Sequence, residues 1–360
     1  MSIPAAAARP IALLERMIAT PSISRDEEAV SLLIADELAA RGIRAERIGR
    51  NIVAGIESID PAKPTLMLNS HIDTVKPAAT YSFDPFTPQH RNGALYGLGS
   101  NDAGASVVSL IEVYDLLRAE PLPYNLLLAI SAEEEVSGEG GMRMLLPALA
   151  ERGIRPEAAL VGEPTGMQPA VAEHGLIVLD CVTHGISGHA ARTEGVNAIY
   201  RAMADIEALR NFRFPRESAE LGPVKVTVTQ IEAGRQHNVI PDECRWVVDV
   251  RTTDAHTNQE TAELLAAAMS PHTTSAPRST RLQASVIDRS HPLVTGAVAL
   301  GRTPYVSPTM SDMALMWGIP SLKMGPGDSA RSHTADEFIR YSEIAEAVEL
   351  YTALLRGLRL

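Results

Sequence analysis

Four short clusters of acidic and histidine residues carry the side chains best suited to chemistry. They are HID at 71–73, ND at 101–102, EEE at 133–135 together with GEP at 162–164, and SHTADE at 332–337. Imidazole and carboxylate groups are ligands that divalent metal ions prefer in proteins. Because a carboxylate is costly to bury unless something pairs with it, several carboxylates in one pocket imply bound cations.

Each cluster follows an apolar stretch at the point where small or turn-forming residues begin. The segments 65–69, 125–131 and 158–161 are short and apolar, which is typical of buried strands. Apolar residues at helical spacing lie between them at 104–118, and a final helix is expected at about 341–358. Buried strands that alternate with helices predict an α/β fold with a mainly parallel sheet flanked by helices. The carboxyl ends of such strands present side chains to a crevice.

The pattern changes between 177 and 284. Strand-like and helical segments follow one another in the order β-α-β-β-α-β, with the last strand expected at 281–287. This is the order of a ferredoxin-like α+β sandwich. The Ser/Thr/Pro-rich stretch 270–280 is expected to be a surface loop. We therefore predict a catalytic domain formed by residues 1–176 and 285–360, with a smaller ferredoxin-like domain inserted at 177–284.

Composition excludes several function classes. The formal net charge of −12 argues against a nucleic-acid surface and against a polybasic membrane anchor. Cys181 and Cys244 are the only cysteines, too few for a disulfide framework, which favours a reduced, cytoplasmic compartment. The first residues show no signal-peptide pattern, and no stretch approaches the roughly 18 apolar residues of a membrane helix.

Each cluster on its own also has an ordinary structural explanation. The pair His71 and Asp73 can lie in a surface turn, and Asp102 in its glycine-rich loop can cap a helix. Three adjacent glutamates at 133–135 can form a solvated surface run. Asp336 and Glu337 can favour the N-terminus of a helix.

Together the clusters predict a site for two metal ions. The proposed ligands are His71, Asp102, Glu135, Glu163 and His333. If Asp102 is shared, each ion has three protein ligands and an open position for water, and the charges of two divalent cations are balanced by three carboxylates and one hydroxide. Asp73 would orient the imidazole of His71. Glu134, left without a metal, is placed to act as general base and then as general acid.

These motifs resemble those of the co-catalytic zinc deacylases and peptidases. That family includes acetylornithine deacetylase, succinyl-diaminopimelate desuccinylase, aminoacylases and glutamate carboxypeptidase. The resemblance covers nearly the whole chain and is carried, in order, by HIDTV at 71–75, YGLGSNDAG at 96–104, AEEEVSG at 132–138, GEPT at 162–165 and HTADEF at 333–338. It implies two divalent ions, zinc first and cobalt or manganese as alternatives.

The inserted domain carries two further motifs of the family. SGHAAR at 187–192 resembles a lid motif, which implies that His189 stabilises the reacting oxygen. HNVIPDECRWVVDVR at 237–251 resembles the lid strands that supply an Asn and an Arg to the substrate, here Asn238 and Arg251. With the turn that begins at Gly325, they are expected to hold a carboxylate. The resemblance also implies a homodimer formed through the lid, with His189 reaching the partner's site.

The predicted function is metal-dependent hydrolysis of the amide bond of an N-acyl amino acid. The motif SNDAGAS resembles the branch of the family that deacylates N-acyl-ornithine or N-acyl-citrulline, which implies N-acetylornithine or N-acetyl- or N-succinyl-citrulline as substrate, in arginine biosynthesis. The chain departs from the residues common in the family's motifs at Leu98, at 103–105 and at Glu133. None of these positions is a proposed ligand. The alternatives are a succinyl-diaminopimelate desuccinylase and a di-zinc dipeptidase or carboxypeptidase. A non-catalytic metal-bound scaffold is disfavoured because Glu134 is present, and a serine hydrolase because no GxSxG occurs. No nucleic-acid or membrane partner is expected.

Overall fold

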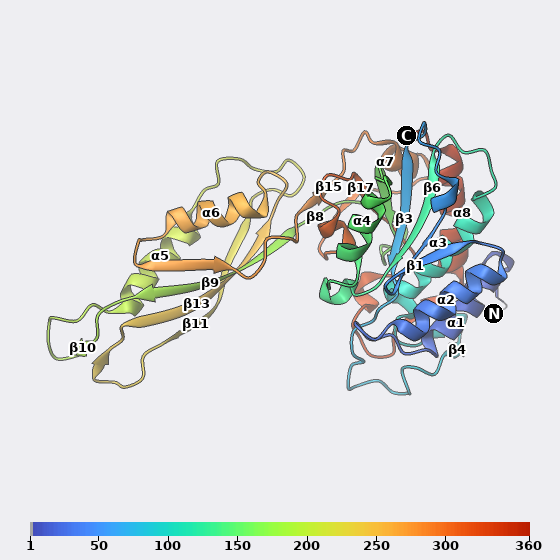
Figure 1. Ribbon diagram of the computed structural model, residues 1–360. Coiled ribbons are helices and arrows are strands. Elements are labelled where there is room, and N and C mark those ends of the chain that lie inside the picture. The colour runs from blue at the N-terminus through green and yellow to red at the C-terminus, as the bar shows by residue number, and fades with distance from the viewer. Residues whose placement is uncertain (1–2) are drawn as a thin grey trace. The chain divides into compact units, whose positions relative to one another are not determined.

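The computed structural model describes residues 3–360, which fold into two compact units (Figure 1). The first unit comprises Met1–Val171, Ile287–Tyr305 and Ser311–Leu360, and the second comprises Ala172–Val286 and Val306–Met310.

The first unit is a sheet with helices on both faces. Its helices are α1 (Ala8–Ile18), α2 (Glu28–Ala40), α3 (Ala105–Leu117), α4 (Met142–Glu151), α7 (Pro292–Ala299) and α8 (Tyr341–Gly357). Its main strands are β1 (Ala45–Ile48), β2 (Asn51–Ala54), β3 (Thr65–His71), β6 (Asn125–Ser131), β7 (Ala158–Val161) and β17 (Ser321–Lys323). Within residues 3–360, no helix combines the length and apolar character needed to cross a membrane.

The strands lie in the order β1-β2-β6-β3-β7-β17-β8, where β8 (Ala170–Glu173) continues into the second unit. The four central strands, β6, β3, β7 and β17, are parallel, and β2 and β1 extend one edge in antiparallel fashion. The predicted α/β fold with a mainly parallel sheet is confirmed. Alternate residues of β3 enter different cores, since Leu66 and Leu68 pack with α1, α2, α3 and α8, whereas Met67 packs with α4. This explains the uninterrupted apolar run Leu66–Leu68 within the strand.

A small antiparallel sheet brings two loops of the predicted site together. It contains β4 (Gln89–Arg91), β5 (Ala94–Tyr96) and β18 (Phe338–Arg340), with β5 in the middle. Tyr96 pairs with Phe338, so the loop that follows β5 lies beside the loop that precedes β18. The first of these loops carries Asp102 and the second carries His333.

The second unit has the predicted ferredoxin-like order. Its elements are β9 (Gly175–His184), β10 (Gly188–His189), α5 (Ala198–Asn211), β11 (Lys225–Ala233), β12 (Val239–Ile240), β13 (Glu243–Thr252), α6 (Asn258–Ala268) and β14 (Thr273–Pro277). The sheet order is β11-β13-β9-β14 and all neighbours are antiparallel. Trp246 lies at the centre of its core, 1% exposed.

The last strand of this sandwich does not lie where the sequence predicts it. We expected a strand at 281–287 and a surface loop at 270–280, but β14 occupies Thr273–Pro277 inside the expected loop. In the region of the expected strand, Ser285 and Val286 form β15, which pairs with β8. The prediction was wrong because β14 is an edge strand. An edge strand has one neighbour only, so it tolerates exposed Ser and Thr and a terminal proline.

Candidate metal centre

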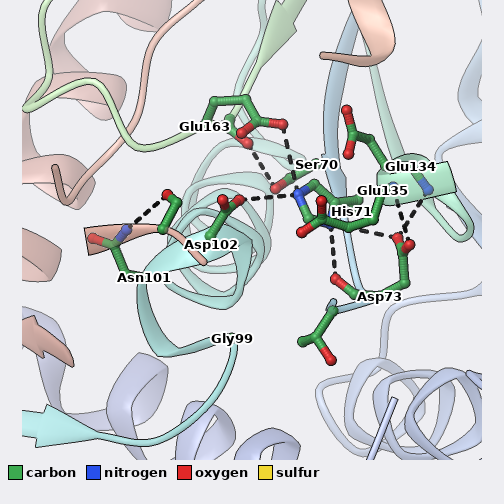
Figure 2. A network of polar contacts seen from close by, with 12 residues as sticks. Ser70, His71, Asp73, Gly99, Asn101, Asp102, Glu134, Glu135 and Glu163 are labelled. Atoms are coloured by element: carbon green, nitrogen blue, oxygen red, sulfur yellow. Dashed lines mark hydrogen bonds and ion pairs between the residues drawn. The ribbon is translucent and has the colours of Figure 1, made fainter. Parts of the chain in front are cut away.

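The predicted ligands of the first unit gather at the carboxyl edge of the parallel strands (Figure 2). His71 is the last residue of β3, and it pairs with Ser131, the last residue of β6. Glu163 lies two residues after the end of β7. Because these strands run parallel, their carboxyl ends meet at the same edge, which brings the three sequence motifs together.

Two groups of potential ligands share Asp102. In one group, His71 Nε2 lies 3.3 Å from Asp102 Oδ1 and 3.6 Å from Glu163 Oε1. In the other, His333 Nε2 lies 3.0 Å from Glu135 Oε2 and 3.7 Å from Asp102 Oδ2. Within each group the ligand atoms all lie within 4.8 Å of one another. The structure thus brings together all five residues that we predicted as ligands.

The spacing of these atoms fits divalent ions. Ligand atoms about 2.0–2.2 Å from a tetrahedral zinc ion lie about 3.3–3.6 Å from one another. The distances from His71 to Asp102 and Glu163, 3.3 and 3.6 Å, match this value. Each oxygen of Asp102 faces a different group, as a bridging carboxylate would.

The excess of carboxylates in the site also fits bound cations. Burial, together with the nearby Asp102 carboxylate, raises the pKa of Glu163 to about 8. A hydrogen bond with Glu135 raises the pKa of His333 to about 9. Both shifts mean that this cluster of carboxylates binds protons more tightly than isolated groups do. A divalent cation supplies the positive charge that these protons would otherwise supply, so the residues fit two metal ions.

The imidazole of His71 is held with Nε2 toward the carboxylates. Its Nδ1 lies 3.0 Å from the carbonyl oxygen of Asp73 and 3.4 Å from Asp73 Oδ1. A proton on Nδ1, donated to the carbonyl, leaves Nε2 as the metal-binding nitrogen. We expected the Asp73 carboxylate to orient the ring, but the backbone oxygen of the same residue is the nearer partner.

The carboxylate of Asp73 instead holds the loop after β6. Its oxygens accept hydrogen bonds from the backbone N–H groups of Glu134 at 2.9 Å and Glu135 at 3.1 Å. Ser24 Oγ donates a third hydrogen bond at 2.7 Å. Burial opposes ionisation, but hydrogen bonds with His71, Ser24 and the backbone lower the pKa of Asp73 below its ordinary value.

The three adjacent glutamates at 133–135 point in different directions. Glu135 faces His333. The Glu134 carboxylate makes no hydrogen bond or ion pair with the other residues drawn in Figure 2. Burial and the neighbouring Glu163 and Asp312 carboxylates raise the pKa of Glu134 well above its ordinary value. Glu133 is buried, so the run is not a solvated surface stretch. Glu134 is therefore the free carboxylate beside both ligand groups.

Glu337 has a role that the sequence did not reveal. Its carboxylate is buried and accepts hydrogen bonds from the backbone N–H groups of Gly99 at 2.9 Å, Asn101 at 2.7 Å and Asp102 at 2.9 Å. The alternative of a helix N-terminus at this position is wrong, because β18 intervenes and α8 begins at Tyr341. Glu337 thus shapes the loop that carries Asp102, and only the three-dimensional fold shows that it is buried.

Asp312 was also missed by the sequence reasoning. It is 3% exposed, and its Oδ2 accepts a hydrogen bond from Ser131 Oγ at 2.5 Å. Burial raises the pKa of Asp312 to about 6. Nothing in the surrounding sequence, SPTMSDMALM, marks a site residue. Asp312 adds to the excess of negative charge around Glu134.

The glycine-rich turn at 325–327 packs against the ligand segments. Gly325 N–H donates to Thr165 Oγ1 at 3.0 Å, and a Cβ atom at Gly325 would lie 2.5 Å from the carbonyl oxygen of Glu163. Gly327 has a φ of 88° and lies against Asn101. These contacts explain the two glycines by close approach, and the substrate role of Gly325 stays a prediction.

The other predicted residues lie in the second unit. His189 is exposed in β10, and Ala190 N–H donates to the carbonyl of Asn238 at 2.9 Å, so His189 and Asn238 are neighbours. Arg251 lies near the carboxyl end of β13, where its guanidinium donates hydrogen bonds to both carboxylate oxygens of Asp249 at 2.9 and 3.2 Å. Their contribution to the site stays a prediction.

Comparison with known proteins agrees with this architecture. The family model of peptidase family M20/M25/M40 matches residues 67–357. The chain is 30% identical over 280 residues to succinyl-diaminopimelate desuccinylase of Paracoccus denitrificans, with 73% of each chain covered. It is 28% identical over 378 residues to acetylornithine deacetylase of Edwardsiella ictaluri, with 96% of each covered.

Solved structures share the fold at low sequence identity. The aminopeptidase PepT of Bacillus cereus matches with a TM-score of 0.75 and 18% identity, covering 98% of each chain. A dinuclear metal-binding M20 peptidase of Bacillus subtilis matches with a TM-score of 0.72 and 19% identity, also over 98% of each chain.

The family match and the similarity to a desuccinylase and a deacetylase show a metal-dependent hydrolase of amide bonds, of the amidohydrolase and peptidase class. The match over most of its length shows that the chain belongs to peptidase family M20/M25/M40.

Proposed function

We propose that this enzyme hydrolyses the amide bond between a small acyl group and the α-nitrogen of an amino acid. One observation carries the proposal, namely the free Glu134 carboxylate beside two ligand groups that share Asp102. Such an arrangement suits the activation of water for attack on an amide carbonyl, followed by protonation of the amine that leaves.

The site residues divide this reaction among them. Two divalent ions, which we propose to be zinc, would when bound polarise the carbonyl and lower the pKa of a water molecule. Glu134 accepts the proton of the attacking water and returns it to the leaving nitrogen. The Asp73 carboxylate holds the backbone of Glu134 by accepting a hydrogen bond from the Glu134 N–H group. We assign to His189 the stabilisation of the oxyanion that develops on the amide carbonyl during attack.

Recognition of the amino-acid part is assigned to the carboxylate-binding groups predicted from the sequence. Arg251 suits bidentate recognition of a carboxylate. In this role it would exchange its present partner Asp249 for the substrate. Asn238 and the turn at Gly325 would complete the carboxylate site.

The substrates that we favour are N-acetylornithine and N-acetyl- or N-succinyl-citrulline, in arginine biosynthesis in the cytoplasm. The sequence SNDAGAS supports this choice, and so does the similarity to an acetylornithine deacetylase across 96% of the chain. Desuccinylation of succinyl-diaminopimelate is the second candidate, because several similar relatives carry that name.

A hydrolysis panel separates these substrates. The purified enzyme is given N-acetyl and N-succinyl forms of ornithine, citrulline and diaminopimelate and one dipeptide, and the released amine is measured. We expect the highest kcat/KM for an N-acyl ornithine or citrulline. A preference for succinyl-diaminopimelate or the dipeptide of about tenfold or more, equal to about 1.4 kcal/mol in transition-state binding, would overturn the choice.

We also propose that the second unit pairs with a second copy of this chain across a two-fold axis. Two features of that unit support the proposal. Strand β11 has a neighbour on one side only and exposes Ile231, 55% accessible. Helix α5 exposes Tyr200 and Met203, which are 71% and 58% accessible. Exposed apolar residues beside an open strand edge are suited to a self-complementary interface.

If the dimer shares its sites, two inactive variants should restore each other. His189→Ala and Glu134→Ala chains are mixed under conditions that allow subunit exchange. In a mixed dimer, one site combines an intact Glu134 with the partner's intact histidine. Half of all dimers are mixed and each has one good site of two, so activity should rise to roughly a quarter of wild type by symmetry.

Each variant alone should stay nearly inactive in this experiment. Exchange is verified with differently tagged chains. If exchange occurs and no activity returns, His189 acts within its own chain or not at all.

A further inference from the structure

Arg50 connects two buried carboxylates on different elements. It occupies the tip of the hairpin between β1 and β2. Its Nε lies 2.7 Å from Glu27 Oε2, at the start of α2, and its Nη2 contacts Glu133 Oε1. The side chains of Glu27 and Glu133 are 0% and 7% exposed. One guanidinium therefore joins the N-terminal helices to the loop that carries the three glutamates.

The carboxylate of Glu133 is enclosed on its other side by glycines. A Cβ atom at Gly138 or at Gly140 would overlap the Glu133 carboxylate, so glycine at these positions lets the carboxylate keep its place. The N–H group of Gly140 also donates to Glu133 Oε2 at 3.3 Å. Glu133 itself has a φ of 54°, in the left-handed region that residues with a side chain rarely adopt. The surroundings of its side chain thus fix an uncommon backbone conformation.

The same hairpin holds both ends of this loop. Asn51, next to Arg50, accepts a hydrogen bond from Ala132 N–H at 2.9 Å and donates one to the Gly140 carbonyl at 2.7 Å. Glu134 and Glu135 lie between these two anchoring points. A change in the hairpin tip is therefore transmitted directly to the backbone of both residues.

We propose that Arg50 is a positioning residue, which by its ion pair with Glu133 fixes the loop that presents Glu134 to the substrate and Glu135 to the metal. Without Arg50, the Glu133 carboxylate would stay buried beside other carboxylates with no cation to compensate it. Such a charge is strongly unfavourable, so the loop would rearrange to expose it. The part that concerns Glu134 rests on the proposed function, whereas the part that concerns Glu135 can be tested without any substrate.

The test compares Arg50→Gln with Arg47→Gln. Arg47 lies on the same hairpin, but its guanidinium pairs with Glu28 of α2 at 2.6 Å and donates to Ser31 Oγ at 3.0 Å, both outside the loop of glutamates. For Arg50→Gln we expect kcat to fall tenfold or more with KM changed less than about twofold, and zinc affinity to fall about 10- to 100-fold. Zinc affinity is measured by competition with a chromogenic chelator. Arg47→Gln should leave kcat, KM and zinc affinity unchanged.

A double variant tests the route through Glu133. If Arg50 acts by pairing with Glu133, Arg50→Gln combined with Glu133→Gln should be no worse than Arg50→Gln alone, because the uncompensated charge is gone. Should Arg50→Gln not fold, Arg50→Lys takes the same comparison. Lysine keeps the positive charge, but one ammonium cannot replace the guanidinium fork, so zinc affinity should still fall, by less than the roughly 10- to 100-fold expected for Arg50→Gln.

Three results would overturn the inference, namely wild-type zinc affinity and kcat in the Arg50 variant, equal losses in Arg47→Gln, or additive losses in the double variant. The proposed function can fail separately. A wild-type enzyme that hydrolyses no N-acyl amino acid would refute that proposal, while the zinc-affinity comparison would still decide the role of Arg50.

Discussion

Replacing Glu134 by glutamine should lower kcat by about 10²- to 10⁴-fold, the contribution typical of a general acid–base residue. Glutamine keeps the size of the side chain but cannot accept the proton of the attacking water. The Glu134 carboxylate makes no hydrogen bond or ion pair with the residues drawn in Figure 2, and the substitution keeps the hydrogen bond from its backbone N–H group to Asp73. Metal content, measured by elemental analysis, should stay at the wild-type value, and so should the melting temperature of the loaded protein.

Glu135→Gln is the matched control, one residue further along the same loop. Glu135 contacts His333 at 3.0 Å, so its replacement should weaken metal binding in the group that contains His333. If Glu134→Gln lost metal and Glu135→Gln kept it, the assigned roles would be reversed, with Glu134 as the ligand and Glu135 as the base.

Replacing Asp102 by alanine should have the largest effect on metal content. Asp102 Oδ1 faces His71 and Asp102 Oδ2 faces His333, so the substitution removes one ligand from each group at once. We expect the variant to retain little of either ion and to lose nearly all activity. Its melting temperature should also no longer rise with added zinc, since bound ions stabilise the folded state by about 2.7 kcal/mol at 100 times the dissociation constant.

Substitutions of unshared ligands separate the two groups. Glu163→Ala belongs to the group of His71, and Glu135→Ala to the group of His333. Each should lose about half of the bound metal in equilibrium dialysis. Loss of only half the metal in Asp102→Ala would show that this carboxylate does not bridge the ions.

Much of the first unit could be predicted because its strands have a simple sequence signal. The strands β6 and β7 are buried on both sides; β7 begins and ends where its apolar residues do, and β6 adds one polar residue at each end of its apolar run. The edge strand β14 was missed for the opposite reason. It is half-exposed, and its Ser, Thr and Pro residues are equally typical of a loop. The antiparallel strand β1, AERI, gave no apolar signal because it is only partly buried and carries two charged residues.

The same distinction applies to the site. His71 ends a buried strand and Glu163 lies two residues beyond another, so the sequence alone indicates where these ligands gather. Residues that support the ligands lack such a signal. Glu337 and Arg50 act through contacts with segments more than 80 positions away in the chain, as the hydrogen bond from Asp102 to Glu337 illustrates. Only the folded chain shows which of its many charged residues are buried and paired.

Metal titration of the purified enzyme tests the central claim most directly. Protein stripped of metal by a chelator, and verified by elemental analysis, is titrated with zinc while hydrolysis of an N-acyl ornithine or citrulline is followed. Our account predicts no activity without metal and a rise to a plateau at about two ions per chain, as a two-metal site requires. Full activity in verified metal-free protein would contradict it.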